Sequence, residues 1–151
     1  QDPVLDVKFE GIERAEPAPG VIEAILNADG IIICPSNPIV SIGPILSIKG
    51  VKEALKKTKA KIVAISPIVG GAPIKGPADK LMRGLGIEVS ALGIAKIYKN
   101  FLDALVIDNV DRDLKPKIEE IGIKVHVTDT IMRTLESKIK LAKETFRLLE
   151  L

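Results

Sequence analysis

The sequence predicts an α/β fold with a mainly parallel β-sheet, and three observations support this prediction. Short apolar segments with strand character alternate along the chain with segments of helical periodicity. Aromatic residues make up only 3% of the 151 residues, so Ile, Val, Leu and Ala must fill the core. Such cores are typical of parallel strands covered by helices on both faces. No repeat or flexible linker interrupts the pattern, so we expect one domain over residues 1–151.

Five strands are expected. The first, at residues 4–12, alternates only moderately and is assigned to a sheet edge. The other four are apolar runs at residues 30–34, 61–65, 104–107 and 122–127. Parallel strands are joined by right-handed crossovers, whose helices pack on the sheet. The expected architecture is therefore Rossmann-like and three-layered, with helices on both faces of a mainly parallel sheet.

Helices are expected between the strands and at the C-terminal end. Pro77 is expected at the first position of one of them, where its missing N–H costs nothing. The last helix is the clearest, because apolar residues recur at helical spacing with Lys and Glu on its other side. The assigned segments are 21–26, an apolar stretch ending near residue 47, 51–58, 77–85, 90–100, 111–121 and 131–149.

The composition excludes several classes of protein. A net charge of +2, evenly spread, is too small for a nucleic-acid-binding surface. One Cys and one His exclude a disulfide framework and argue against a zinc site, and both Cys34 and His126 are expected to be packing residues. No apolar run approaches the ~20 residues that span a bilayer, and no signal-peptide pattern is present. We therefore expect a cytoplasmic protein without nucleic-acid or membrane partners.

The candidate binding residues follow the expected strands. In open α/β sheets, ligands bind beyond the carboxyl ends of the strands, so polar residues in these loops should share one rim. The candidates for nucleotide or diphosphate binding are Ser36, Asn37, Ser41, Gly43, Ser66, Gly70, Gly71, Lys75 and Gly76, and further possible contacts are Asp108, Thr128, Thr130 and Arg133. No nucleophile–His–acid arrangement is present among them, so no catalytic residue is assigned.

The loop after the strand at 30–34 has the composition of an anion site. Pro35 and Pro38 fix the backbone around Ser36 and Asn37, and a helical segment with free backbone N–H groups is expected to follow. We interpret this loop as a phosphate or diphosphate cradle, although it lacks the Gly-Lys-Ser/Thr of the Walker pattern. The alternative is a rigid turn in which a serine caps the following helix.

The loop at residues 66–77 is long for a compact domain, and loops of this kind are usually functional or disordered. The Gly70–Gly71 pair would allow a ligand to approach the backbone closely. Lys75 precedes an expected helix start, where a cation and free N–H groups together could hold an anion. The alternative for Lys75 is an ordinary solvated lysine.

The loops after the last two strands contain both possible ligand contacts and expected helix caps. Asp108 could contact a ribose, a base or a metal ion. Asp111 is expected to be the N-cap of the next helix. Residues 128–130, Thr-Asp-Thr, are expected to cap the last helix, with Arg133 one turn further as a possible phosphate partner.

Several strings resemble one known family across nearly the whole chain. They are Cys-Pro-Ser-Asn-Pro-Ile-Val-Ser-Ile-Gly-Pro-Ile-Leu (34–46), Ile-Ser-Pro-Ile-Val-Gly-Gly-Ala-Pro-Ile-Lys-Gly-Pro-Ala (65–78), Ser-Ala-Leu-Gly-Ile-Ala (90–95), Val-Ile-Asp (106–108) and Thr-Asp-Thr-Ile-Met (128–132). In this order they resemble the 2-phospho-L-lactate transferase (CofD) family of coenzyme F-420 biosynthesis, known from archaeal-type enzymes. The first two strings are long and specific, which makes chance agreement improbable.

The resemblance implies an activity. Family members transfer a 2-phospholactyl group from lactyl-2-diphospho-5'-guanosine to the deazaflavin alcohol Fo, with Mg²⁺, and release GMP. Some relatives use a phosphoenolpyruvyl or phosphoglyceryl donor instead. Attack of an alcohol on a diphosphate needs alignment and charge neutralisation more than covalent catalysis. A GDP-like donor, the acceptor Fo, Mg²⁺ and a homodimer are therefore the partners that the resemblance implies.

The chain also departs from the family. Members are about twice as long and begin with a glycine-rich strand–loop–helix that is absent here. The chain begins with Gln1 instead of Met and resembles their C-terminal half. Metal ligands and most Fo contacts are therefore expected outside it. A related group of nucleotide-sugar-binding regulatory proteins, with Gly-Pro-Gly-Ser in the corresponding loop, is the alternative. A third possibility is a dimerising or scaffold part with empty loops.

The first prediction concerns activity. The purified chain, given the guanosine diphosphate-linked donor, Fo and Mg²⁺, is expected to show no transfer, because the half that carries the metal ligands is missing. Formation of GMP and of phospholactylated Fo, followed by chromatography, measures this. Detectable turnover by the purified chain would contradict the prediction.

Overall fold

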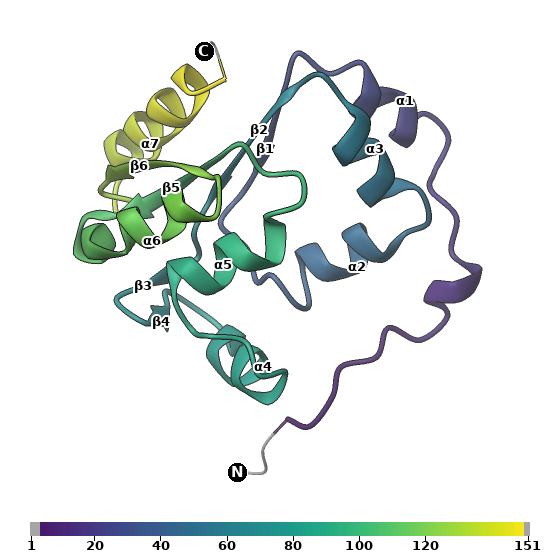
Figure 1. The fold of residues 1–151 in the computed structure, drawn as a ribbon, viewed down its shortest axis with the longest axis horizontal. Coiled ribbons are helices and arrows are strands. Elements are labelled where there is room, and N and C mark those ends of the chain that lie inside the picture. The colour runs from purple at the N-terminus through teal and green to yellow at the C-terminus, as the bar shows by residue number, and fades with distance from the viewer. Residues whose placement is uncertain (1–3, 150–151) are drawn as a thin grey trace.

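The fold is built on a four-stranded parallel sheet. In the computed structural model, which describes residues 4–149, the strand order is β1-β2-β5-β6 (Figure 1). The strands span Gly30–Ile33 (β1), Lys61–Ile65 (β2), Ala104–Asp108 (β5) and Lys124–Thr128 (β6). Each is an apolar run bounded by polar or glycine-rich loops, and β5 is buried along its whole length. The four strands predicted from these runs are confirmed within a residue or two.

Helices cover the two faces of the sheet unequally. One face packs against α2 (Ile42–Ser47), α3 (Val51–Lys57), α5 (Ala91–Tyr98) and α6 (Lys115–Glu120), and forms the larger core. Within residues 4–149, the helix on the other face is α7 (Leu135–Arg147), and Leu148 and Leu149 just beyond it pack there as well (Figure 1). Val63 and Val106 on this face are completely buried beneath Leu141. The predicted Rossmann-like, three-layer α/β arrangement is confirmed, with one thick and one thin helical layer.

The remaining elements are short. Helix α1 (Val21–Leu26) precedes β1, and α4 (Ala78–Gly84) lies between β2 and α5. The long loop after β2 holds a small antiparallel hairpin, β3 (Ile68–Val69) and β4 (Ala72–Pro73). Two 3-10 helices span Ile12–Arg14 and Asn109–Leu114. No helix within residues 4–149 is long and apolar enough to cross a membrane.

The expected edge strand at residues 4–12 is wrong. Residues 4–9 follow an irregular path and lead into the 3-10 helix at Ile12–Arg14. Phe9 instead packs over Gly43 at the start of α2, where a Cβ on Gly43 would come within 3.1 Å of the ring. The weak alternation of apolar residues in this segment does not mark a strand. Phe9 attaches the irregular segment to the start of α2 instead.

Helix boundaries differ from the prediction around α4 and α6, and at the start of α7, which begins at Leu135 instead of residue 131. The segment 111–121 is divided into a 3-10 helix at Asn109–Leu114 and the short helix α6. Pro77 occupies the N-cap position of α4, just before the first helical residue at which it was expected. Helix propensity alone cannot separate a 3-10 turn from an α-helical turn, because both present similar spacing over one turn.

Cys34 and His126, both expected to be packing residues, lie in different surroundings. Cys34 is exposed at the end of β1, so its assignment as a buried packing residue is wrong. His126 lies in β6, and its Nε2 is 3.0 Å from a carboxylate oxygen of Glu144 in α7. This contact ties α7 to the edge of the sheet.

The pH dependence of stability should report this contact. The hydrogen bond with His126 is the main cause that lowers the pKa of Glu144 below its ordinary value of 4.5. Because the pKa is lowered by folding, the ionised carboxylate stabilises the protein above pH ~4.5, and this stabilisation is lost as the pH falls through the lowered pKa. The urea midpoint should therefore decrease more steeply in this acidic range than that of Glu144→Gln, which cannot titrate. Parallel profiles would contradict the prediction.

Candidate functional site

A cavity of about 360 Å³ lies at the carboxyl ends of β1, β2 and β6. Three loops and one turn of α7 form its wall, as expected for a ligand site of an open α/β sheet. Its lining residues are Pro35, Asn37, Ser66, Pro67, Pro73, Ile74, Lys75, Ala78, Thr130, Ile131, Met132 and Lys138. The predicted candidates Asn37, Ser66, Lys75 and Thr130 are therefore brought together at one place.

The other candidates do not line this cavity. They are Ser36, Ser41, Gly43, Gly70, Gly71, Gly76, Asp108, Thr128 and Arg133. Most belong to the same loops, so the expectation of a shared rim is correct for the loops but not for every residue. A direct role of these residues in binding stays a prediction.

Asn37 organises the first loop from within. Its Oδ1 accepts hydrogen bonds from the N–H groups of Ile39 and Val40, and its carbonyl oxygen accepts from those of Ser41 and Ile42. These N–H groups, which include the first of α2, are therefore already satisfied, and anion binding by the rest of the helix start stays a prediction. The alternative, a serine cap, fails for Ser41, whose side chain makes no capping hydrogen bond to α2. The amide Nδ2 of Asn37 makes no hydrogen bond within residues 4–149, so it is available to a ligand in the cavity.

The second loop is held in shape by its own hydroxyl and glycine groups. The Ser66 hydroxyl is buried, donates to the carbonyl of Ile68 and accepts from the Ile68 N–H. Gly70 and Gly71 have φ values of 59° and 77°, as a tight hairpin turn between β3 and β4 requires. The glycine pair thus has a structural reason to be there, and the hairpin leads the chain back to Lys75 at the cavity.

Asp111, in the 3-10 helix after β5, holds the turn of this hairpin in place. Both of its carboxylate oxygens accept from the Gly70 N–H at 3.1 Å, so its assignment as an N-cap is wrong. Burial is the main cause that raises the pKa of Asp111 above its ordinary value, the Gly70 hydrogen bond opposes this, and the charge of Asp108 adds to it. The cap of the 3-10 helix is Asp108 instead, whose Oδ1 accepts from Val110.

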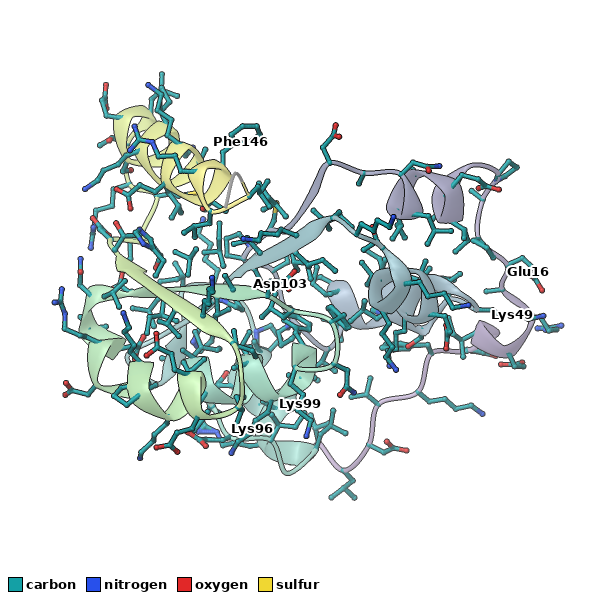
Figure 2. All side chains as sticks on the ribbon, turned by 45° about the horizontal axis from the view of Figure 1, so that its top comes forward. Glu16, Lys49, Lys96, Lys99, Asp103 and Phe146 are labelled. Atoms are coloured by element: carbon teal, nitrogen blue, oxygen red, sulfur yellow. The ribbon has the colours of Figure 1, made fainter. Side chains whose placement is uncertain are left out.

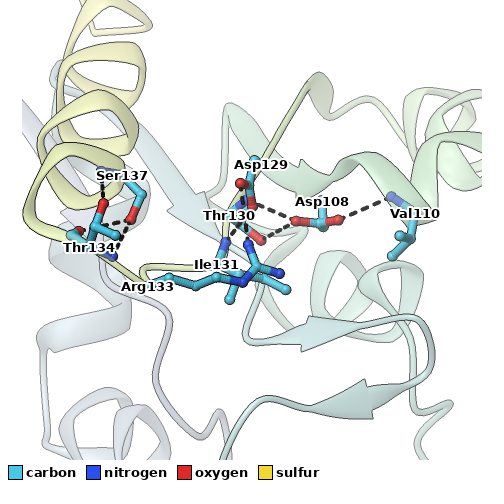
Figure 3. A network of polar contacts seen from close by, with 8 residues as sticks. All are labelled: Asp108, Val110, Asp129, Thr130, Ile131, Arg133, Thr134 and Ser137. Carbon is cyan, nitrogen blue, oxygen red and sulfur yellow. Dashed lines mark hydrogen bonds and ion pairs between the residues drawn. The ribbon is translucent and has the colours of Figure 1, made fainter.

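Asp108 also positions the loop after β6. Its Oδ2 accepts from the backbone N–H of Thr130 at 2.8 Å and from the Thr130 hydroxyl at 3.1 Å (Figure 3). Asp108 is only 4% exposed and Thr130 only 6%. The carboxylate therefore acts within the protein, where it holds Thr130 against the cavity, and has no oxygen turned freely to solvent.

The start of α7 differs from the prediction. Residues 128–130 do not cap it, because Thr134 and Ser137 form a reciprocal capping box several residues later (Figure 3). Arg133 directly precedes this capping box and forms an ion pair with Asp129 at 3.5 Å. The cation that α7 places at the cavity is Lys138, which the sequence interpretation missed. The helical spacing placed Lys138 on a polar face, but the direction of that face depends on how α7 packs.

The cavity is electropositive in composition. Lys75 and Lys138 line it, and neither lysine forms an ion pair within residues 4–149. The lining contains no Asp or Glu. Asn37 and Thr130 add uncharged polar groups, while Ile74, Ile131 and Met132 add apolar surface. Two cations, an amide and an apolar wall are suited to an anion attached to a flat or apolar group.

The described residues do not form a metal site by themselves. Within residues 4–149, no three His, Cys, Asp or Glu side chains are grouped so that they could hold a metal ion. The pair Asp108 and Asp111 is committed to backbone N–H groups. The expectation that any Mg²⁺ ligands lie outside this chain stays a prediction.

Comparison with known proteins identifies the family. The model of the 2-phospho-L-lactate transferase CofD family matches residues 1–146. The chain belongs to the CofD family. This confirms the resemblance carried by the loops after β1 and β2, which supply most of the cavity wall.

Curated CofD relatives are close in sequence but longer. The 2-phospho-L-lactate transferase of Methanocaldococcus jannaschii is 51% identical over 140 residues, which cover 93% of this chain and 43% of the relative. That of Methanothermobacter thermautotrophicus is 49% identical over 140 residues, with 93% and 44% covered. The chain thus spans less than half the length of these CofD relatives.

A solved structure shows the same fold at low sequence identity. A crystal structure of a protein from Bacillus halodurans matches with a TM-score of 0.56 and 18% identity, over 87% of this chain and 47% of that protein. The likeness supports the Rossmann-like arrangement of this CofD chain.

Asp108→Ala should test the link between β5 and the cavity loop. The substitution leaves buried donors of Thr130 without an acceptor, which typically costs about 1–3 kcal/mol in the free energy of unfolding. Asp129→Ala is the matched control, because its ion pair with Arg133 and the hydrogen bond that it accepts from the Ile131 N–H are both exposed, and an exposed ion pair contributes less than about 1 kcal/mol. Urea denaturation of both variants measures the difference. A loss no greater for Asp108→Ala than for Asp129→Ala would refute this role.

Proposed function

We propose that this chain forms the part of a 2-phospho-L-lactate transferase that binds the diphosphate of a guanosine-linked donor. The observation that carries the proposal is the convergence of Lys75 and Lys138 on one cavity whose lining holds no carboxylate. Membership of the CofD family and relatives named 2-phospho-L-lactate transferase support the same reaction.

The proposed reaction joins the phospholactyl group to the alcohol of Fo. The hydroxyl oxygen attacks the phosphorus that carries the lactyl group, and the bond from this phosphorus to the bridging oxygen breaks. GMP leaves with the bonding electrons, and the hydroxyl proton passes to solvent or to a base. Negative charge grows on the bridging oxygen, so cations held at that point lower the barrier. Lys75 and Lys138 are the groups of this chain that are suited to that task.

Each remaining polar group of the cavity has a corresponding role in the proposal. The Asn37 amide donates to a phosphate oxygen, and Asp108 keeps the Thr130 backbone in place beside it. Ile74, Ile131 and Met132 provide apolar surface for a flat ring of the donor or acceptor. Mg²⁺, held by residues outside this chain, would neutralise further phosphate charge. The homodimer and the cytoplasmic location stay predictions.

A thermal-shift experiment tests the donor site. GDP should stabilise the chain, because a ligand at ~100 times its Kd adds about 2.7 kcal/mol to the free energy of unfolding. For a domain of this size, that corresponds to several degrees in Tm, at about 2–4 °C per kcal/mol. UDP-sugars should have no effect. Stabilisation by UDP-sugars with GDP inert would favour a nucleotide-sugar-binding protein, and no response to either would favour a scaffold part with empty loops.

Lysine variants connect any GDP effect to the cavity. Lys75→Ala and Lys138→Ala should each weaken GDP binding about tenfold or more, since a hydrogen bond to a charged group contributes roughly 1.5–3 kcal/mol. Lys143→Ala is the matched control: it also removes one positive charge from exposed α7 surface but does not line the cavity. Equal weakening by all three substitutions would show that only net charge matters and would remove the two lysines from the site.

A further inference from the structure

Helix α7 carries an exposed apolar stripe beside its buried face. Leu135, Ile139, Ala142 and Phe146, here called the α7 stripe, follow one another at helical spacing. Leu135 is 67% exposed, Ile139 45% and Phe146 59%. Phe146 projects clear of the sheet in Figure 2. By contrast Leu141, which packs on the sheet, is only 3% exposed. The helix is therefore apolar over a wider arc than its contact with the sheet uses.

The α7 stripe lies on the side of α7 that is turned away from β6. Glu144 points to His126 on β6, and residues 142 and 144 are about 200° apart around an α-helix. The stripe therefore lies on the flank of α7 turned away from β6 and toward β1. Leu149, at the end of the helix, lies against Gly30 of β1. Ile32 of β1 lies on this same face of the sheet and is 38% exposed.

One helix is too narrow for this face. Neighbouring strands lie about 4.8 Å apart, and a helix with its side chains is roughly 10 Å wide, so α7 covers about two of the four strands. Within residues 4–149 no second helix packs beside α7 on this face, and Ile32 stays partly exposed there. Strand β1 is also an apolar edge strand with no partner on its outer side among the described residues. Such edges are normally paired or covered.

The topology says where a second helix has to come from. The crossovers from β1 to β2, from β2 to β5 and from β5 to β6 all move in one direction across the sheet. Right-handed crossovers in one direction place their helices on one face, as α2, α3, α5 and α6 show. A crossover helix on the other face requires connections that run the opposite way, through strands added beyond β1.

We propose that the α7 stripe and the outer face of β1 bind an apolar helix from the part of the CofD polypeptide that this chain does not span. The relatives from Methanocaldococcus jannaschii and Methanothermobacter thermautotrophicus have more than half of their length outside the match. That length is sufficient for strands beyond β1 and their crossover helices. The contact is an interaction between the two halves of the enzyme and is independent of which donor the cavity binds.

Cysteine labelling in a full-length chimera tests the proposal. The chimera is the M. jannaschii relative with its 140 matching residues replaced by those of this chain. In a background with Cys34→Ser and other cysteines changed to serine, Ala142→Cys places a thiol on the α7 stripe. Lys140→Cys, on nearly the opposite side of the same helix, is the matched control. Maleimide should react with Cys at position 142 at least tenfold more slowly than at position 140.

The labelling rates either support the proposed helix contact or overturn it. Equal labelling rates at the two positions in a folded, monomeric chimera would overturn the proposal. Slow labelling at position 142 that disappears on dilution would also overturn it, because a second copy would then cover the stripe. Cooperative thermal unfolding identifies folded variants. If the chimera does not fold, the same two cysteines are placed at the aligned positions of the relative itself, where the same rates are expected.

Discussion

The handedness of the strand crossovers is the constraint on which the rest of this structure depends. Because β1, β2, β5 and β6 are parallel and follow one another across the sheet, their carboxyl ends meet at one edge. The same geometry places the crossover helices on one face and, within residues 4–149, leaves α7 as the helix on the other. The position of the cavity and the thinness of one helical layer therefore have a common cause.

At the carboxyl edge, the polar residues divide into two groups. Asn37, Asp108 and Asp111 use their oxygens to satisfy backbone N–H groups of the loops, which makes the loops rigid before any ligand arrives. Among residues 4–149, Lys75 and Lys138 have no such internal partner, and both line the cavity. A site of this kind spends little binding energy on ordering its own backbone, so more is available for the ligand.

The sequence predicted the fold better than the site, for physical reasons. Buried apolar runs such as 61–65 and 104–107 have only one stable place in an α/β sheet, so their strands were predictable. Residues 4–12 have a weaker pattern, and the packing of Phe9 on Gly43 decided their path. Asn37 and Lys138 could not be assigned in detail, because an amide oxygen does not reveal its partner and a helix does not reveal its orientation. The loops themselves were predictable because they follow strands.

The order of the strands in space is the same as their order in the chain. During synthesis from the N-terminal end, each strand therefore finds its neighbour already made, and the sheet grows from β1 toward β6 one crossover at a time. Contacts between strands that are adjacent in sequence keep loop-closure costs low for a parallel sheet. Strand β1 is therefore the first strand of this sheet to be made, and α7, which follows β6 in the chain, is the last helix to pack on it.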